Sequence, residues 1–218
     1  MQHRDIGDLM RYAALNQNGD FLAKHGDFMP QEAFGPIPQD PAQYEFGRYS
    51  DEQLYALALY VYSLQPPPNP NKFDALAARG QKIFERKGCT GCHTPPLYSN
   101  NKLTPACSFK MPEGHNKKFG VKDVCVNTNS DLALKTRRGT GYYKVPSLRN
   151  VWARGPLEHS GSVATLEDWF DPNRVDDDYV PTGFRGHGVK TRAVEGHLFG
   201  LELSDEDRKA LIAFLKTL

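Results

Sequence analysis

The residues Cys89-Thr90-Gly91-Cys92-His93 constrain this chain more than any other feature of its sequence. Two thiols three positions apart, followed directly by an imidazole, form the C-x-x-C-H pattern of covalent haem attachment. Each thiol can form a thioether with one vinyl group of the same porphyrin, and the histidine then lies under the iron as proximal ligand. The pattern therefore predicts one covalent haem c, bound by Cys89, Cys92 and His93.

Two other uses of such a cysteine pair fit the sequence less well. A zinc site would need a second ligand pair with short spacing, and the sequence contains none. A thioredoxin-like redox pair would need a βαβ setting, whereas the flanks of this motif have helical patterns.

The remaining cysteines, Cys107 and Cys125, have seventeen residues between them. They could be free thiols, but bacterial haem attachment takes place outside the cytoplasm, where disulfides also persist. We therefore expect a Cys107–Cys125 bridge, which would remove denatured-state entropy worth roughly 3 kcal/mol. The same argument predicts a periplasmic, exported protein.

Charge and composition limit the classes of partner that this chain can bind. The 218 residues include 27 basic and 26 acidic side chains, so the net charge of +1 gives no footprint for nucleic acid. The longest apolar stretches are too short to form a transmembrane segment. The N-terminal residues lack the apolar core of a signal peptide, although a haem c protein should be exported, so we expect a mature form or a fragment of something longer.

Two segments share one pattern. Ser50 can cap a helix that ends before the proline-rich stretch 65–71, which favours an extended linker. The apolar face of that helix is predicted to contain Leu54, Leu57, Val61 and Leu64. Ser204 can cap the last helix, with Asp207 at the capping-box position. The apolar face of this second helix is predicted to contain Leu211, Phe214, Leu215 and Leu218.

This similarity can arise by chance, or it can indicate a repeated domain. A repeat predicts three parts: residues 1–64 as the end of an upstream copy without a haem motif, 65–71 as linker, and 72–218 as the haem c domain. The fold class is then mainly α, a cytochrome c-type haem domain with long loops, preceded by a helical part of a similar domain.

The remaining elements are short. Residues 73–87 predict a helix that leads to the haem motif and stops at Gly88. Its buried face is predicted to contain Leu76, Ile83 and Phe84. Residues 94–145 have no sustained period and predict a long loop region. A short helix is expected to begin at Pro146 and another at the cap Thr165; the second ends before the helix-breaking Pro172.

Four stretches together resemble a known family. The helix into the haem motif, TGYYKVPSLRNV at 140–151, EHSGSVATLED at 158–168 and IAFLKTL at 212–218 resemble, in this order, the C-terminal haem domain of bacterial di-haem cytochrome c peroxidases. The same family includes the MauG-type enzymes. The resemblance implies an upstream cytochrome c domain with its own C-x-x-C-H, and residues 1–64 resemble only the end of that domain.

In these peroxidases the C-terminal haem relays electrons while the other haem meets peroxide. The resemblance therefore implies one-electron transfer with a redox partner protein or a second haem domain. A chain with one motif should not be assumed to be a complete peroxidase, so its status as an enzyme stays open, as does its oligomeric state. Two alternatives remain: a stand-alone monohaem electron carrier, or a five-coordinate haem peroxidase or gas-binding sensor.

The sixth iron ligand has several candidates. Family members carry it shortly before the last helix, where this sequence has His197, and no methionine follows Met111. Nearby glycines allow close backbone approach to a flat cofactor. His93 and His197 are thus the expected metal ligands, with Met111 or an open site as alternatives. The other histidines considered are His115, His159 and His187.

Further cofactor contacts are expected around the motifs that carry the resemblance. His159 matches the histidine of the family's His-Asp-Gly-Ser motif, with Ser160 replacing the aspartate, and could donate hydrogen bonds near the haem edge. Arg138 and Arg149 could pair with haem propionates, or could be surface charges. Tyr142 or Tyr143 could pack on the porphyrin.

Two other features of the sequence have ordinary structural explanations beside a functional one. Trp152 and Trp169 are more often core residues than electron relays. The acidic run 176–178 could bind calcium, but a lone acidic loop is most often solvated.

Overall fold

The computed structural model describes residues 6, 9–10, 51–126, 130–135 and 140–218, and the chain divides after Pro67 into two units, Met1–Pro67 and Pro68–Leu218. In the first unit, helix α3 (Asp51–Ser63) buries Leu54 and Ala58. The predicted apolar face is wrong in part, because Leu57 is 44% and Leu64 54% exposed. Positions 54 and 58 lie one turn apart and share a face. The expected cap Ser50 lies outside the described residues.

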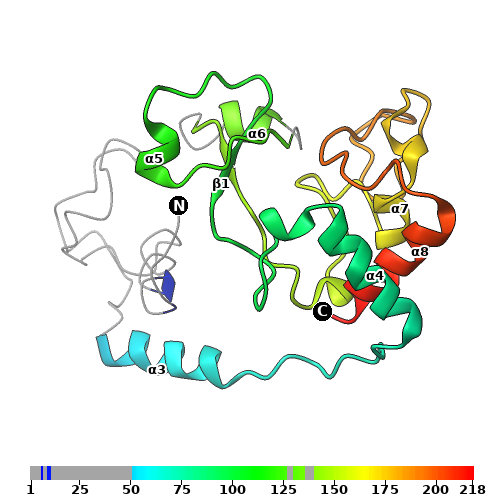
Figure 1. Ribbon diagram of the computed structural model, residues 1–218. Coiled ribbons are helices and arrows are strands. Elements are labelled where there is room, and N and C mark those ends of the chain that lie inside the picture. The colour runs from blue at the N-terminus through cyan, green and yellow to red at the C-terminus, as the bar shows by residue number, and fades with distance from the viewer. Residues whose placement is uncertain (1–5, 7–8, 11–50, 127–129, 136–139) are drawn as a thin grey trace. The chain divides into compact units, whose positions relative to one another are not determined.

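The core of the second unit is a pair of helices that lie side by side (Figure 1), α4 (Ala75–Arg86) and α8 (Asp205–Lys216). The carboxylate of Asp74 accepts a hydrogen bond from the Ala77 amide at 2.9 Å and begins α4. The Ser204 hydroxyl caps α8 by accepting from the Asp207 amide at 3.3 Å, which confirms the expected cap.

The face of α4 that packs on α8 differs from the predicted one. Leu76 is 44% exposed, whereas Ala77, Gly80, Ile83 and Phe84 are buried. A methyl group at Gly80 would lie 1.9 Å from the Ala210 carbonyl oxygen. The two backbones therefore approach as closely as a glycine allows, and small residues occupy the crossing where the sequence pattern favoured large ones.

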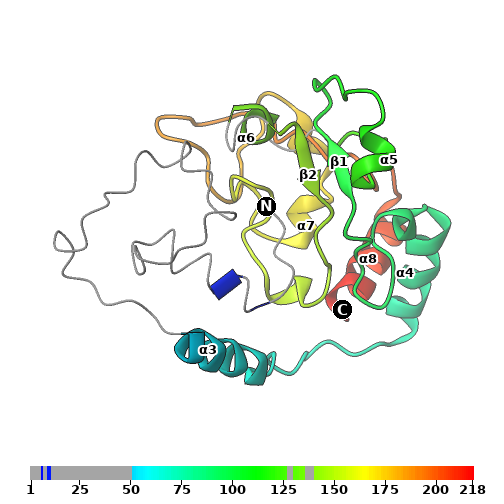
Figure 2. The ribbon, with the colours of Figure 1, turned by 90° about the vertical axis from the view of Figure 1, so that its left-hand side faces the viewer.

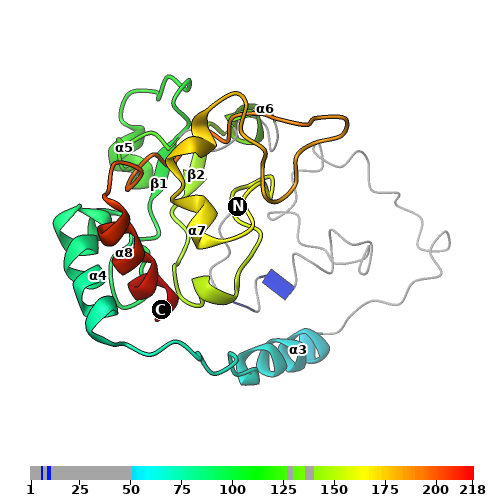
Figure 3. The same ribbon diagram turned by 90° about the vertical axis from the view of Figure 1, so that its right-hand side faces the viewer.

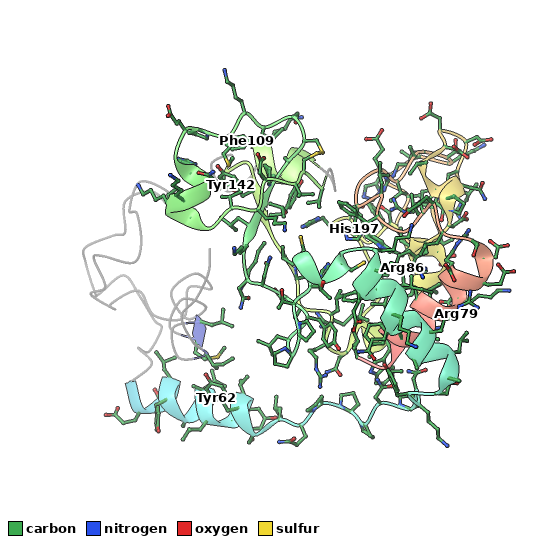
Figure 4. All side chains as sticks on the ribbon, viewed as in Figure 1. Tyr62, Arg79, Arg86, Phe109, Tyr142 and His197 are labelled. Carbon is green, nitrogen blue, oxygen red and sulfur yellow. A yellow bond between two sulfur atoms is a disulfide. The ribbon has the colours of Figure 1, made fainter. Side chains whose placement is uncertain are left out.

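Asp207 does not complete a capping box. Its carboxylate instead pairs with Arg79 at 2.5 Å and with Arg86 at 3.2 Å, both labelled on α4 in Figure 4. Both arginines are more than half exposed, so these ion pairs contribute little to stability.

The segment predicted as loop contains several short elements, which Figures 2 and 3 show from two sides. Strands β1 (Leu103–Pro105) and β2 (Tyr142–Lys144) pair antiparallel, with Thr104 opposite Tyr143. Helices α5 (His115–Phe119) and α6 (Ser130–Lys135) lie between them in sequence. Elements of three to six residues are too short to give a detectable hydrophobic period.

The haem motif and the last part of the chain add single turns: η2 (Cys89–Gly91), η3 (Val151–Ala153), α7 (Leu166–Trp169) and η4 (Pro172–Val175). The expected cap Thr165 is confirmed, because it forms a reciprocal capping box with Asp168. The helix predicted from Pro146 is wrong; residues 146–148 have no regular structure, 149–150 form a turn, and the first helical residue is Val151.

The described residues are thus mainly helical with one two-stranded sheet, as predicted. Within these residues, no helix combines the length and the apolar character that crossing a bilayer requires.

The expected disulfide is confirmed: Cys107 and Cys125 are bonded and tie together the segment that follows β1. Replacing both with serine should lower the free energy of unfolding by about 3 kcal/mol, because the denatured chain regains the entropy of an open loop. Denaturant titration of both proteins, followed by circular dichroism, measures this difference. Proteolysis should increase between residues 107 and 125 more than in the α4–α8 core. Rapid alkylation of both thiols in the native, unreduced protein would contradict the bridge.

Candidate haem-binding site

A cavity of about 820 Å³ lies in the second unit. Its volume is in the upper part of the range of ligand and cofactor sites, roughly 300–1,000 Å³. Apolar side chains from many segments line it, among them Phe84, Val145, Leu148, Leu166, Phe170 and Leu211. The sequence-predicted site residues that line it are Cys89, Cys92, His93, Tyr143, His159 and His197. A large apolar cavity thus collects the residues that sequence analysis put forward from four separate segments.

The haem motif reaches the cavity through a sharp turn. Gly88 has a left-handed backbone, with φ of 74°, which reverses the chain after α4 at little steric cost. The amides of Cys92 and His93 then donate to the Cys89 carbonyl at 3.2 and 2.8 Å. Neither Cys89 nor Cys92 is in a disulfide, and both are half-buried. Burial raises the pKa of the Cys89 thiol. The single turn therefore presents two unbonded thiols to one cavity.

The imidazole of His93 is oriented by the main chain. Its Nδ1 lies 3.1 Å from the Tyr98 carbonyl oxygen. With the proton on Nδ1, the ring donates to that carbonyl and keeps the lone pair of Nε2 for a metal. Burial lowers the pKa of His93, so the neutral, metal-binding form is favoured. No sequence signal indicated this carbonyl, because only the fold brings it to the ring.

His197 approaches the same space from the segment before α8 (Figure 4). Its ring centre lies 6.3 Å from that of His93 and 5.5 Å from that of Trp169. Its Nδ1 is buried and has no hydrogen-bond partner among the described residues. Burial, followed by the proximity of His93, lowers the pKa of His197 to about 4. The imidazole is therefore neutral at physiological pH and available as a metal ligand.

These residues fit a covalently bound haem. A metal bonded to one nitrogen of each of two facing imidazoles, at about 2.0–2.1 Å per bond, separates the ring centres by roughly 6 Å. The 6.3 Å between His93 and His197 agrees with that separation. Two thiols and a histidine in one turn are the groups that covalent attachment of a haem c requires, and the second histidine and the largely apolar wall of the same cavity are compatible with such a group.

The neighbouring tyrosines have different environments. Tyr143 is buried, lines the cavity, and its ring centre is 4.7 Å from that of His159. Tyr142 instead bonds through its hydroxyl to Nδ1 of His115 at 2.8 Å and packs on Phe109, beside which Figure 4 labels it. Successive residues of a strand point to opposite faces, so β2 sends only one of the two tyrosines to the cavity.

Of the two arginines predicted to pair with haem propionates, the structure describes only Arg149. Arg149 is exposed and does not line the cavity, and Arg138 lies outside the described residues. The cationic residues in the cavity wall are Lys87, Lys122, Lys144 and Arg154. Arg154 was not predicted to line the site, because it lies five positions beyond Arg149 and outside any recognisable motif.

The other candidates lie elsewhere. Met111, His115 and His187 do not line the cavity. The acidic run 176–178 is exposed, and no group of three or more metal-binding side chains occurs within the described ranges. Trp169 contacts His197 in the cavity wall, whereas Trp152 does not line the cavity.

The amino-acid sequence is similar to those of several bacterial proteins named as cytochrome c peroxidases, and to that of MauG. No family model matches it. It is 32% identical over 88 residues to a cytochrome c551 peroxidase of Nitrosomonas europaea, which covers 40% of this chain and 24% of that protein. A cytochrome-c peroxidase of Denitromonas iodatirespirans is 25% identical over 162 residues, 66% of this chain and 40% of the relative. The methylamine utilization protein MauG of Methylorubrum extorquens is 28% identical over 143 residues, 65% of this chain and 34% of the relative.

The chain thus spans a quarter to two fifths of the length of these curated relatives. The similarities agree with the ordered motifs of the sequence and with the cavity that unites the C-x-x-C-H residues and His197. The chain is therefore similar in sequence to bacterial cytochrome c peroxidases and to MauG over part of their length.

Proposed function

We propose that this chain is a c-type cytochrome domain that transfers single electrons, equivalent to the electron-relay domain of its peroxidase relatives. The observation that carries the proposal is the pair of histidines: His93 and His197 enter one cavity with their ring centres 6.3 Å apart. If both histidines bound the iron of a haem held here, peroxide would have to displace one of them to reach the metal. Iron held by two protein ligands favours electron transfer over catalysis at the metal.

The protein would hold the cofactor through Cys89, Cys92 and His93, and His197 would be a further candidate ligand to its iron. A bound haem c supplies one-electron chemistry between ferric and ferrous iron. The Tyr98 carbonyl orients His93, and most of the cavity wall is apolar. Limited solvent access and a low local dielectric are the properties by which a protein sets the reduction potential of such a group.

The partner in this proposal is a redox protein or a second haem domain. The relatives carry the name of peroxidases and are much longer than the region they share with this chain. We place the protein in the periplasm because haem c attachment and the Cys107–Cys125 disulfide both belong to an oxidising compartment.

His197 provides the decisive test. The unmodified holoprotein should have a low-spin, six-coordinate optical spectrum in both oxidation states, and cyanide, carbon monoxide and peroxide should bind slowly because His197 must leave first. His197→Gly should shift the iron toward high spin and permit fast ligand binding. Optical spectra and stopped-flow cyanide binding measure both effects.

Two matched variants are the controls. His159 lies in the cavity wall with its ring against Tyr143, and His187 lies outside the cavity, so neither His159→Ala nor His187→Ala should change the coordination number. If the unmodified protein is already high-spin and binds peroxide quickly, the relay proposal is wrong. A five-coordinate haem enzyme would then be indicated, with His159 or Tyr143 as candidates for proton transfer.

A further inference from the structure

Arg174, in η4, is fully buried, with 0% of its surface exposed. Its guanidinium donates four hydrogen bonds, and all four acceptors are main-chain carbonyls. Nε donates to Trp169 at 2.8 Å, and Nη1 donates to Val194. Nη2 donates to Gly196 at 2.9 Å and to His197 at 3.0 Å. One side chain thus binds both the end of α7 and the segment that carries His197, the candidate sixth ligand of the iron.

The segment that Arg174 binds has an unusual backbone. Gly196 has φ of 93° and His197 has φ of 45°, a left-handed conformation that is uncommon for a residue other than glycine. The carbonyls of Val194, Gly196 and His197 converge on one point, and without a donor there they would be buried and unsatisfied. A planar fork with five N–H groups is the side chain that can satisfy them together. Arg174 therefore fixes the backbone from which the His197 imidazole projects.

The charge of Arg174 is not neutralised by a contact. Within the described ranges it forms no ion pair, and the carboxylates that act on it from a distance bond elsewhere. Asp171 accepts from the Asn173 amide at 2.9 Å, and Glu158 accepts from Ser160. An arginine stays protonated in proteins, so a positive charge is buried next to the segment 194–197.

Trp169 lies close both to this charge and to the His197 ring. The Arg174 guanidinium carbon is 5.0 Å from the Trp169 ring centre, and that ring centre is 5.5 Å from His197. A buried cation at this range disfavours added positive charge at His197 and at a metal bound to it. Ferric iron carries one more positive charge than ferrous iron, so the cation favours the reduced state.

We propose that Arg174 is a positioning residue for the distal ligand: it holds His197 in the cavity, and its unpaired charge raises the reduction potential of a haem bound there. This inference rests on the proposed electron-transfer function. It assigns two separable effects to one side chain, a hydrogen-bonding effect on ligation and a charge effect on potential.

The test compares Arg174→Lys, which keeps the charge but not the fork, with Arg174→Gln, which loses the charge. The control is Arg185→Gln, an exposed arginine of the same region that donates to the Pro181 carbonyl outside the cavity. In both Arg174 variants the high-spin fraction and the cyanide binding rate should rise, and added imidazole should restore the low-spin spectrum. Arg185→Gln should behave as the unmodified holoprotein does.

The charge effect is measured with ligation held constant. In a His197→Gly background saturated with imidazole, the variant with glutamine at 174 should show a reduced-to-oxidised ratio at least tenfold lower at a fixed potential. That change corresponds to about 59 mV for a one-electron couple. In this background, the reduction potential of the variant with lysine at 174 should stay close to that of the protein with arginine. A purely structural role for Arg174 would not make the potential follow the charge.

Each outcome decides the proposal. Unchanged spectra and cyanide rates in both variants would overturn the positioning role, and equal potentials for arginine and glutamine would overturn the charge effect. If the Arg174→Gln protein does not retain haem, the Arg174→Lys protein decides whether Arg174 positions His197. A low-spin spectrum with slow cyanide binding in that protein would refute the positioning role. A high-spin unmodified protein would instead refute the proposed function, whatever the Arg174 variants show.

Discussion

Replacing both Cys89 and Cys92 with serine should abolish covalent haem attachment completely. A hydroxyl does not add to a vinyl group as a thiol does, so both thioethers are lost at once. The turn that presents the two thiols is held by main-chain bonds to the Cys89 carbonyl, so serine should preserve its backbone. The intact mass of the purified variant should equal that of the polypeptide alone, whereas the unmodified protein should carry the mass of one haem.

The single variants and the disulfide pair complete this experiment. Each single serine variant can keep one thioether and should retain some covalent haem after denaturation. The matched control replaces Cys107 and Cys125, which are bonded to each other and lie outside the cavity. That variant should keep its full haem content. Haem that survives denaturation in the Cys89/Cys92 double variant would refute the assignment of the motif.

Gly80→Ala should strongly destabilise the second unit. In the middle of a helix this exchange normally stabilises by about 0.5–1 kcal/mol, because glycine loses more backbone entropy on folding. Here the new methyl group would lie 1.9 Å from the Ala210 carbonyl oxygen and 2.8 Å from Cβ of Phe214. Rigid backbone cannot move aside locally, so α4 and α8 must separate along their length.

We expect the free energy of unfolding to fall by about 3 kcal/mol or more, at the upper end of the usual cost of overpacking. Denaturant titration of the two proteins measures the difference. Lys82→Ala is the control, because Lys82 is exposed on the same helix and its exchange should be nearly neutral. A Gly80→Ala protein as stable as its parent would show that the helices do not cross at this distance.

The features that sequence analysis predicted depend on local chemistry. The C-x-x-C-H motif requires its residues in one turn, and the caps Ser204 and Thr165 bond within their own helices. Such contacts involve neighbours in the chain, so the amino-acid order alone indicates them. The disulfide between Cys107 and Cys125 was predicted from the compartment and from the count of the remaining cysteines.

The features that sequence analysis missed depend on tertiary contacts. Leu76 was a better candidate for burial than Gly80 by hydrophobicity, but the close crossing of two helices requires the smaller residue. Arg154 rather than Arg149 lies in the cavity wall because the chain turns between them at η3. Arg174 lies in a polar stretch that resembles a surface loop, and only the fold brings the four carbonyls to it.

The separation of the two histidines along the chain has a consequence for assembly. His93 and His197 lie roughly 100 residues apart, and closing a loop of that length costs chain entropy equivalent to about 4.7 kcal/mol. A metal bound by both would therefore fasten the first and last parts of the second unit together. Until it is in place, the contacts between α4 and α8 must themselves offset the cost of closing that loop. The cofactor would then act as a clamp between these two distant parts of the folded chain.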